Sequence, residues 1–527
     1  MNAMTMDLTW APPAGEYNAA SDLVDRTVAA GFANKAAFID PTRQITYREL
    51  QQRCNRFANG LRRLGIRREE RIALITLDTV DMPVVFWGAI KAGIVPIPIN
   101  TLLTPEFWTY MIEDSRAAAV VVSAELLDRV GPVLEAIRQQ RPLHVIVSGQ
   151  GVFPEAVNLE AFLGEGSDEA LAAPTRADEV AFWLYSSGST GAPKGTRHLH
   201  ASPMYTARLF AQNVLKFSSE DVVFSAAKLF FAYGLGNSMS FPMSVGATAI
   251  LLPDRPTPDS VVKVMRDHQP TIFCGVPTLF ASMLANKDIG QGAGSDRLRL
   301  TTSAGEALPE EIGLRWQEKV GTEVIDGIGS TEMLHIFVSN RPGSVRYGSS
   351  GTPVPGYEAK LIDDAGNLVP QGEIGELIIK GPSSAEGYWL QRAKTRRTFC
   401  GEWTYTGDKY RIGEDGFYYY CGRTDDMFKV SGIWVSPFEI ESVLLTHASV
   451  LEAAVVGKED TDGLVKPKAF VVLKPGAANS ETLFEDLKAH VKNNAGAWKY
   501  PRWMEVREDL PKTATGKIQR FKLREES

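Results

Sequence analysis

The chain contains 527 residues, 44% of them hydrophobic and 23% charged, and it carries a formal net charge of −7. This length exceeds the ~250–300 residues at which a single hydrophobic core stops growing, so we expect at least two domains. The acidic balance and the lack of a long basic run argue against a nucleic-acid partner. The most apolar segment, 82–100, contains Lys91 and three prolines and is a poor membrane span, and four scattered cysteines favour a reducing, cytoplasmic setting.

Short apolar runs alternate with amphipathic stretches through the first 330 residues. The stretch 46–65 predicts a helix, and 82–100 predicts a helix that leads into a buried strand. Strands are predicted over two groups of runs, which are 71–77, 117–123 and 144–149, then 222–227, 247–253, 270–276 and 298–304. Continuously apolar strands separated by helices are typical of parallel βαβ units. The two groups, one on either side of a glycine-rich segment, therefore predict two α/β subdomains.

The glycine-rich segment is YSSGSTGAPKG, residues 185–195. Its small residues let the backbone approach a ligand closely, while several hydroxyls and Lys194 add donors and charge. This composition indicates a cradle for phosphate oxygens. It is not a Walker A loop, because Pro193 rather than glycine precedes the lysine. A surface loop without a ligand is the alternative interpretation.

Two later segments place acidic side chains where a nucleotide could meet them. DGIGSTEM, residues 326–333, puts Thr331 and Glu332 after a predicted strand, at the edge where open α/β sheets bind ligands. Glu332 could ligate Mg²⁺ and Thr331 could contact a phosphate, although a helix cap with an acidic first turn is the alternative. YTGDKY, residues 405–410, offers the Asp408 carboxylate to a ribose diol.

The pattern of turns and strands changes after residue 343. Dense Gly and Pro turns with short strands over 343–381 predict a β-rich subdomain. Beyond Asp425 the pattern predicts a compact α+β domain. Its predicted elements are a helix over 437–447, a hairpin over 451–474 and a helix over 480–496.

Five segments, in this order, resemble the acyl-adenylate-forming superfamily of acyl-CoA synthetases, luciferases and peptide-synthetase adenylation domains. They are YSSGSTGAPKG, DGIGSTEM, YTGDKY, GRTDDMFKVSG (422–432) and PKTATGKIQR (511–520), and the match runs from about residue 20 to the end. The resemblance implies an α/β fold with a large N-terminal domain, 1–424, made of two βα subdomains plus a β-barrel-like subdomain. A small mobile α+β domain, 425–527, would carry the catalytic lysine.

The same resemblance implies roles for individual residues. Catalysis would involve Lys517, Glu332, Thr331 and Lys429, with Glu332 also ligating Mg²⁺. Asp425 would be the hinge, and Gly432 would border the coenzyme A tunnel. ATP would be bound by a larger set, consisting of Ser186, Ser187, Gly188, Ser189, Thr190, Gly191, Lys194, Gly305, Glu306, Ala307, Asp326, Gly327, Ile328, Asp408 and Arg423.

The acyl pocket that the resemblance implies has a mixed aromatic and aliphatic wall. It comprises Phe231, Ala232, Tyr233, Ala304, Leu334, His335 and Ile336. The segments KLFFAYGLGN and STEMLHIFVSN look most like the benzoate-CoA ligase branch, and burial of a flat ring would supply the affinity. Two interpretations of His335 stay open, a structural histidine or a hydrogen-bonding partner for the substituent of a hydroxy- or aminobenzoate.

The implied reaction joins benzoate to coenzyme A with ATP and Mg²⁺, through an acyl-adenylate and with release of AMP and pyrophosphate. Loading of a carrier protein is an alternative, although the chain ends ten residues past Lys517, which favours a free thiol acceptor. A non-catalytic regulator is a third hypothesis, opposed by the presence of Lys517, Glu332 and Asp408. Related ligases are regulated by acetylation of this lysine, which predicts a lysine acetyltransferase as a partner, and a homodimer is compatible with the sequence.

Overall fold

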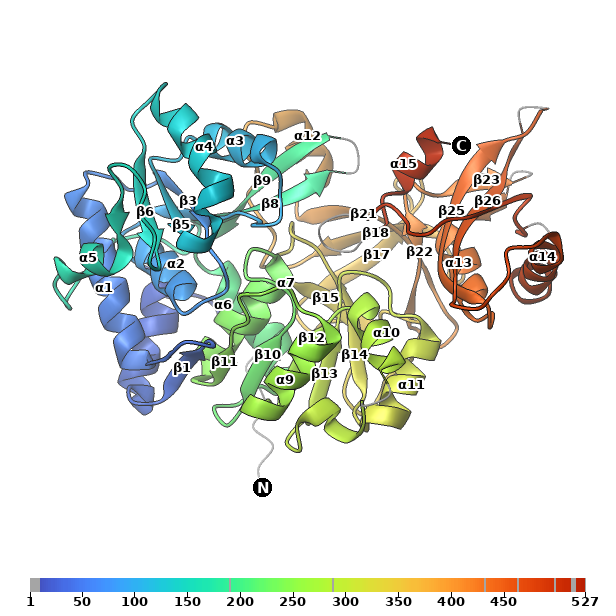
Figure 1. Ribbon diagram of the computed structural model, residues 1–527, viewed down its shortest axis with the longest axis horizontal. Coiled ribbons are helices and arrows are strands. Elements are labelled where there is room, and N and C mark those ends of the chain that lie inside the picture. Colours follow the sequence, from blue (N-terminus) through green and yellow to red (C-terminus); the bar gives the residue numbers. More distant parts are fainter. Residues whose placement is uncertain are drawn as a thin grey trace.

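A computed structural model describes residues 10–188, 191–286, 289–430, 433–461, 464–496, 499–512 and 518–526. Four sheet-based parts make up the larger portion of the molecule, and a smaller α+β unit follows them in the chain (Figure 1). The predicted α/β class and the division into a large N-terminal and a small C-terminal part are confirmed.

The first part is a five-stranded sheet, entirely parallel, in the order β4-β3-β5-β6-β7. The helix expected over 46–65 begins with a capping box, in which Thr46 and Glu49 each bond the other's backbone N–H. The strands are β3 (Arg71–Ile75), β4 (Val95–Pro98), β5 (Ala119–Ser123), β6 (His144–Ser148) and β7 (Val157–Asn158), and the helices are α1 (Tyr47–Arg63), α2 (Asp81–Lys91), α3 (Pro105–Asp114), α4 (Leu127–Arg138) and α5 (Leu159–Gly164).

The second part is a nine-stranded mixed sheet in the order β16-β15-β14-β13-β12-β10-β11-β1-β2. Its strands are β1 (Ala36–Ile39), β2 (Gln44–Thr46), β10 (Val222–Ser225), β11 (Thr248–Ile250), β12 (Ile272–Gly275), β13 (Leu300–Ser303), β14 (Val324–Gly329), β15 (Ile336–Ser339) and β16 (Thr352–Pro353). Helices along this stretch are α6 (Ser202–Thr206), α7 (Ala232–Leu235), α8 (Phe241–Val245), α9 (Pro258–His268), α10 (Pro277–Ala285) and α11 (Glu310–Val320).

The strand order of this sheet differs from the expectation that the strands before and after the glycine-rich segment form two separate subdomains. Strands β1 and β2 come from the N-terminal segment, yet β1 pairs in parallel with β11. The backbone of β1 therefore completes the hydrogen bonding of a strand more than 200 residues away. Strand order depends on such nonlocal pairing, which the periodicity of a segment does not encode.

The glycine-rich segment is mostly strand rather than loop, which corrects the sequence expectation. Strands β8 (Val180–Gly188) and β9 (Gly191–Leu199) form a long antiparallel hairpin, and the short strand β19 (Gly387–Tyr388) pairs with β9. Ser186 pairs with Lys194 across the hairpin. Cross-strand hydrogen bonds stabilise extended backbone even where glycine and serine have low strand propensity.

The β-rich subdomain extends beyond the expected segment 343–381 to residue 423. Its five strands are antiparallel, in the order β17-β18-β21-β20 with β22 also paired to β21. They are β17 (Glu358–Ile362), β18 (Gly375–Lys380), β20 (Phe399–Cys400), β21 (Trp403–Ile412) and β22 (Tyr418–Arg423), and α12 (Arg392–Thr398) precedes β20.

The C-terminal unit has its own hydrophobic clusters, whose members all come from residue 428 onward. A three-stranded sheet, β25-β26-β27, packs against helix α13 and against α15. The elements are β23 (Phe428–Val430), β24 (Ile433–Val435), α13 (Pro437–Leu445), β25 (Val450–Glu459), β26 (Val465–Leu473), α14 (Glu481–Ala495), β27 (Trp503–Val506) and α15 (Arg520–Glu525). The expected helix–hairpin–helix order is confirmed.

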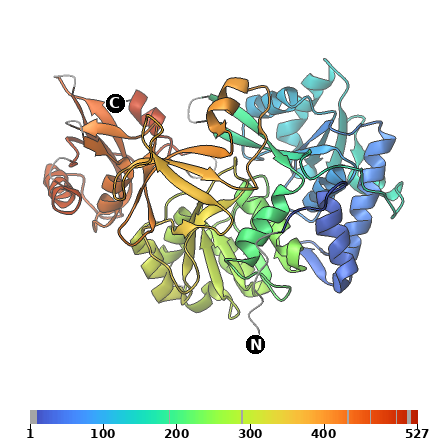
Figure 2. The ribbon, with the colours of Figure 1, turned by 180° about the vertical axis from the view of Figure 1, so that it is seen from behind.

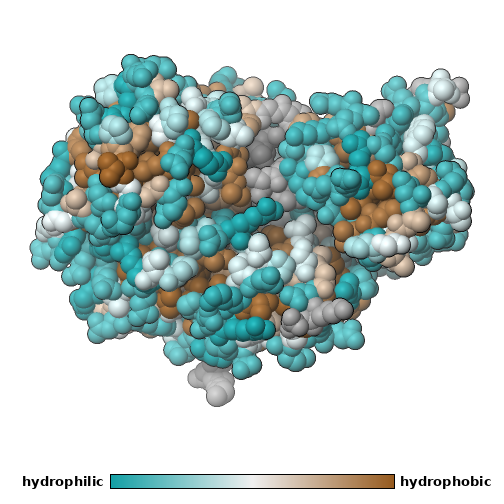
Figure 3. Space-filling view, in the orientation of Figure 1, coloured by the Kyte–Doolittle hydropathy of each residue, from teal (hydrophilic) through white to brown (hydrophobic). Residues whose placement is uncertain are grey.

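The view from behind shows the C-terminal unit set apart from the N-terminal sheets, with the β-rich strands between them (Figure 2). Hydrophilic side chains cover most of the face in Figure 3, interrupted by apolar groups at the upper left and on the C-terminal unit. Among the helices described, none combines the length and the apolar character needed to cross a bilayer.

Candidate active site

Segments that are distant in the sequence converge on the Glu332 carboxylate. The Tyr388 hydroxyl donates a hydrogen bond to Glu332 Oε1 at 2.7 Å, and the Ser186 hydroxyl donates to the same oxygen at 3.2 Å. The Ala385 N–H donates to the Glu332 carbonyl at 2.8 Å, which fixes the backbone at this position. The glycine-rich hairpin, the segment after β14 and strand β19 therefore meet at one carboxylate.

Lys194 adds a cation to this cluster. Its Nζ lies 3.8 Å from Glu332 Oε1, donates to the Tyr388 hydroxyl at 3.3 Å and sits 4.4 Å from the centre of the Tyr388 ring. Burial lowers the pKa of Lys194, an effect that the negative charge of Glu332 opposes. A half-buried lysine with one distant carboxylate has donors left over for an anion, so this arrangement suits phosphate oxygens.

A second charged pair lies on neighbouring strands of the β-rich sheet. Asp408 on β21 and Arg423 on β22 are direct cross-strand partners, and Arg423 Nη1 lies 3.1 Å from Asp408 Oδ1. The negative charge of Asp408 raises the pKa of Arg423, and Glu332 contributes in the same direction. The field of Glu332 thus reaches both Lys194 and Arg423, so the two charged pairs belong to one site.

The end of β14 supplies the residues expected to line adenine. Asp326 is only 3% exposed, its Oδ1 has no hydrogen-bond partner among the described residues, and burial raises its pKa to about 8. Gly327 and Gly329 allow the β15 segment to approach closely, because a Cβ at Gly327 would lie 2.7 Å from the Val338 carbonyl oxygen and one at Gly329 would lie 2.6 Å from that of His335. Gly305, with φ of 96°, forms the turn after β13, next to Ala304, Glu306 and Ala307.

His335 lies between Tyr233 of the expected acyl pocket and Phe241, an aromatic residue outside the expected set. Its ring centre lies 4.4 Å from that of Phe241 and 5.5 Å from that of Tyr233, and its Nε2 is 3.3 Å from the Tyr233 carbonyl oxygen. Burial lowers the pKa of His335 to about 3, so the ring is neutral near pH 7. Nδ1 has no hydrogen-bond partner among the described residues. His335 therefore holds the backbone of Tyr233 while keeping one polar atom unused.

The remaining residues of the expected acyl pocket come from α7 with the residue before it, and from the segments at the ends of β13 and β15. Tyr233 lies in α7, and its hydroxyl shares a 2.7 Å hydrogen bond with the Thr302 hydroxyl of β13. Phe231, Ala232 and Tyr233 are partly exposed, whereas Ala304, Leu334 and Ile336 are buried. Leu334 has a positive φ of 65°, so the turn between β14 and β15 is constrained there.

Several of the expected site residues cannot be placed. Ser189, Thr190, Gly432 and the expected catalytic Lys517 lie outside the described residues. Only the backbone is described for another group, which consists of Ser187, Gly188, Gly191 and Lys429. Thr331 and Ile328 are described and half-buried at the end of β14 and just beyond it.

The expected hinge, Asp425, lies in the short segment between β22 of the β-rich sheet and β23 of the C-terminal unit. On its N-terminal side the Thr424 N–H donates to the Gly407 carbonyl of β21 at 2.9 Å. On its C-terminal side the Asp426 carboxylate accepts from Arg524 of α15 at 2.7 Å. Arg524 also donates to the Asp425 carbonyl at 3.2 Å, while the Asp426 N–H donates to the Arg423 carbonyl at 3.0 Å, so residues 424–426 are bonded to both units.

Tyr388 is the site residue that sequence reasoning missed. It lies in the segment GYWLQ (387–391), which carries no cluster of polar or acidic residues to attract notice. Only the pairing of β19 with β9 brings its hydroxyl to Glu332. A tyrosine is often a core residue, so its position in the fold, not its type, identifies it.

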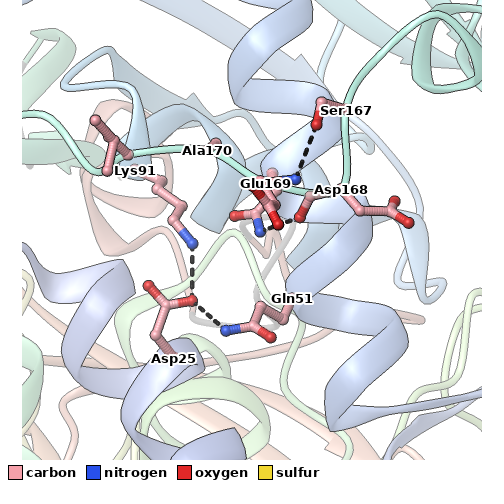
Figure 4. A pocket seen from close by; sticks show the side chains of 9 residues that line it. Asp25, Gln51, Lys91, Ser167, Asp168, Glu169 and Ala170 are labelled. Atoms are coloured by element: carbon pink, nitrogen blue, oxygen red, sulfur yellow. Dashed lines mark hydrogen bonds and ion pairs between the residues drawn. The ribbon is translucent and has the colours of Figure 1, made fainter.

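A separate polar pocket of about 570 Å³ lies between α1, α2 and the segment 167–171 (Figure 4). The buried Lys91 donates to Asp25 at 2.7 Å, and Gln51 donates to the same carboxylate oxygen at 2.8 Å. The groups at its centre thus bond to one another. None of the expected site residues lines this pocket, so it is not part of the candidate active site.

The comparisons with known proteins agree with this geometry. The AMP-binding enzyme family matches residues 25–389, and the AMP-binding enzyme C-terminal domain matches residues 439–517. Since the first match alone spans more than half of the chain, the protein belongs to the AMP-binding enzyme family.

Individual relatives within this family show which of its members the chain is similar to. The chain is 56% identical over 510 residues to the benzoate–CoA ligase of Thauera aromatica, covering 96% of each chain. It is 53% identical to the 4-hydroxybenzoate–CoA/benzoate–CoA ligase of Rhodopseudomonas palustris, covering 97% of this chain and 95% of that one. The crystal structure of a benzoate CoA ligase from Burkholderia xenovorans superposes with a TM-score of 0.89 at 52% identity, covering 96% of this chain and all of that one.

Replacing Tyr388 with phenylalanine should weaken nucleotide binding. The change removes the hydroxyl that donates to Glu332 and accepts from Lys194 but keeps the ring beside Lys194. Loss of a hydrogen bond to a charged group predicts a roughly tenfold weaker affinity for Mg²⁺ and a non-hydrolysable ATP analogue, measured by calorimetry. Tyr419→Phe is the matched control, because its hydroxyl also donates to a carboxylate, Asp415, at 2.7 Å. Equal effects of the two variants on this affinity would contradict the assignment of Tyr388 to the nucleotide site.

Replacing Asp326 with asparagine should change how stability depends on pH. The folded carboxyl has a pKa of about 8 against an ordinary value of 3.8 for aspartate, so between these two pH values the folded state holds a proton that the unfolded state has released. Stability of the natural protein therefore falls as pH rises from about 4 to 8 through this group, and asparagine removes that loss. The thermal midpoint of the variant minus that of the natural protein should therefore increase as the pH of the measurement is raised from 5 to 8. Parallel profiles would show that Asp326 ionises normally.

Proposed function

We propose that the protein ligates benzoate to coenzyme A through a benzoyl-adenylate, with consumption of ATP and release of AMP and pyrophosphate. The carrying observation is the convergence of Lys194, Glu332 and Arg423 at one site, in a chain that is 56% identical over 96% of its length to a benzoate–CoA ligase. The site residues named from the sequence fit this reaction as described below.

The nucleotide would extend from the end of β14 to the tip of the β8–β9 hairpin. Asp326, Gly327 and Ile328, with Gly305 to Ala307, would line adenine. The Asp408–Arg423 pair would hold the ribose hydroxyls, since a carboxylate accepts both O–H groups of a diol. Thr331 would contact the α-phosphate, and the hairpin with Lys194 would contact the β- and γ-phosphates.

Glu332 fits a Mg²⁺ ligand. Its carboxylate offers hard oxygen atoms, and its nearest lysine is 3.8 Å away rather than in a close ion pair. Among the residues that the structure describes, no group of three or more His, Cys, Asp or Glu side chains could hold a metal ion by itself. Such a metal would share phosphate oxygens with ATP and stabilise negative charge that develops on them.

The first half-reaction brings two anions together. A benzoate oxygen attacks the α-phosphorus of ATP, a bond to phosphorus forms, and the bond to the departing pyrophosphate breaks. Lys194 would offset charge at the pyrophosphate, and Lys517 would offset charge where the carboxylate meets the α-phosphate. Preorganised charge of this kind is worth ~3–4 kcal/mol in the barrier.

The aryl ring would lie among Phe231, Ala232, Tyr233 and the β14–β15 turn that carries His335. His335 is neutral and already bonded to the Tyr233 backbone, which supports the structural interpretation of this residue. An unsubstituted ring brings no polar group of its own into this wall, so no substituent has to be desolvated, and benzoate is expected to be preferred over hydroxy- and aminobenzoates.

The second half-reaction would require the C-terminal domain, 425–527, to turn about Asp425. The thiol of coenzyme A attacks the acyl carbon and AMP leaves. The turn would withdraw Lys517 and bring Lys429 and Gly432 to the thiol path. The hydrogen bonds of residues 424–426 to both units support a pivot in this segment, because the two units are joined there. Transfer to a carrier protein remains the alternative. A cytoplasmic location is proposed because four scattered cysteines fit a reducing compartment.

Isotope transfer tests the proposed chemistry directly. Benzoate labelled with ¹⁸O in its carboxylate should pass one labelled oxygen to AMP, because the acyl–phosphate anhydride is cleaved at the acyl carbon by the thiol. Mass spectrometry of the AMP reads the result. In the same assay, benzoate should exceed acetate, decanoate and 4-hydroxybenzoate in kcat/KM. Unlabelled AMP, or a preference for a straight-chain acid, would overturn the proposal.

Replacing Lys517 with alanine should separate the two half-reactions. Adenylate formation should fall by at least ~10²-fold, because a charge that acts in that step is gone, while thioester formation from synthetic benzoyl-adenylate should be nearly unchanged. Lys429→Ala should show the reverse pattern, to a lesser degree. Lys512→Ala is the control, since Lys512 lies in the same segment but pairs with Glu452 and Asp509. Equal losses in both steps for Lys517→Ala would contradict its role.

Acetylation of Lys517 would remove the same charge and should reproduce the alanine phenotype. Treatment with a lysine acetyltransferase and acetyl-CoA, followed by mass spectrometry, checks whether this lysine is modified. An unmodified Lys517 beside an acetylated control protein would refute the hypothesis.

A further inference from the structure

We propose that the cationic face of α12, formed by Arg392, Lys394, Arg396 and Arg397, is a docking surface for the triphosphate of ATP, which it captures before the nucleotide enters the site. This inference rests on the proposed ATP site but concerns residues that none of the five motifs contains. It assigns a binding role to a surface helix.

The charge of this segment is unlike that of the rest of the chain. Residues 387–401, GYWLQRAKTRRTFCG, contain four cations and no acid, in a protein whose net charge is −7. The proposed substrates, benzoate, ATP and coenzyme A, are all anions. An acidic protein repels them at long range, so a local concentration of positive charge is needed to draw them to one place.

Among the residues that the structure describes, the four cations have no ion-pair partner. All four are exposed, and within the described part of the chain none forms an ion pair. Arg392 and Arg396 are spaced i,i+4, and Lys394 and Arg397 are spaced i,i+3, so like charges face each other on a seven-residue helix. Such pairs destabilise a helix. A local arrangement that opposes folding without compensation is typical of a functional surface.

The position of α12 connects it to the phosphate side of the site. Thr395 accepts a hydrogen bond from the Tyr388 N–H at 3.0 Å, so the inner face of the helix is attached to β19, which pairs with β9 of the glycine-rich hairpin. Lys394 is near enough to Lys194 for its charge to lower the pKa of that lysine. Both ribbon views show α12 beside the β8–β9 hairpin (Figures 1 and 2).

This geometry favours ATP over coenzyme A as the occupant. Lys194 would contact the β- and γ-phosphates, so cations beside Lys194 lie along the route of the triphosphate. The same surface would hold pyrophosphate briefly as it leaves. Capture of the nucleotide of coenzyme A is the competing outcome, which the experiment below separates.

The test replaces all four cations with glutamine. The control variant changes Arg48, Arg266, Arg297 and Arg315 to glutamine; these are exposed, lie elsewhere on the surface and lower the net charge by the same four units. Stopped-flow association of a fluorescent ATP analogue, without any acid, should be ~10-fold slower for the α12 variant at low salt and should depend less on ionic strength. The control should match the natural protein.

Two further measurements decide between occupants. Pyrophosphate release with benzoate, in the absence of coenzyme A, should show a fall in kcat/KM for ATP with little change in kcat. Thioester formation from preformed benzoyl-adenylate should keep its kcat/KM for coenzyme A. Equal association rates for the two variants, or a loss confined to coenzyme A, would overturn the inference. Because the fluorescence assay needs no acid, its result stands even if benzoate proves not to be the substrate.

Discussion

The site depends on holding one carboxylate and one amine close together without letting them neutralise each other. Glu332 and Lys194 lie 3.8 Å apart, and the Tyr388 hydroxyl bonds to both. The tyrosine gives the carboxylate a neutral donor, so the lysine is not drawn into a close ion pair. The oxygen atoms of Glu332 and the N–H donors of Lys194 are then available for a metal ion and for phosphate.

The rest of the fold supplies what this contact requires. The antiparallel turn from β14 to β15 positions Glu332, the β8–β9 hairpin positions Lys194, and β19 adds to that hairpin to bring Tyr388 into place. Asp408 and Arg423 belong to a different sheet, yet the charge of Glu332 acts on Arg423. Sheets that share no hydrogen-bonded strands are thus coupled through charged side chains at their meeting point.

The acyl wall and the nucleotide wall are built on adjacent elements. Asp326 and His335 lie close in sequence, on either side of the β14–β15 turn, and burial keeps each of them uncharged near neutral pH. The wall proposed for the aryl ring of the substrate is therefore nearly free of charge. The charged side chains lie at the end proposed for phosphate and ribose, and they are Lys194, Glu332, Asp408 and Arg423. This separation suits a substrate pair made of an apolar ring and a polyanionic nucleotide.

Periodicity in the sequence was sufficient to determine the α/β class, most strands and the C-terminal unit, because these depend on local patterns. The motifs and the resemblance they carry named Glu332, Asp408 and Arg423 as candidate site residues. They could not determine that β1 joins a sheet built mainly by residues after 220, that the glycine-rich segment is paired strand, or that Tyr388 contacts Glu332. Each of these rests on hydrogen bonds between residues far apart in the chain. Such pairing is selected by the packing of the whole molecule, and no single segment records it.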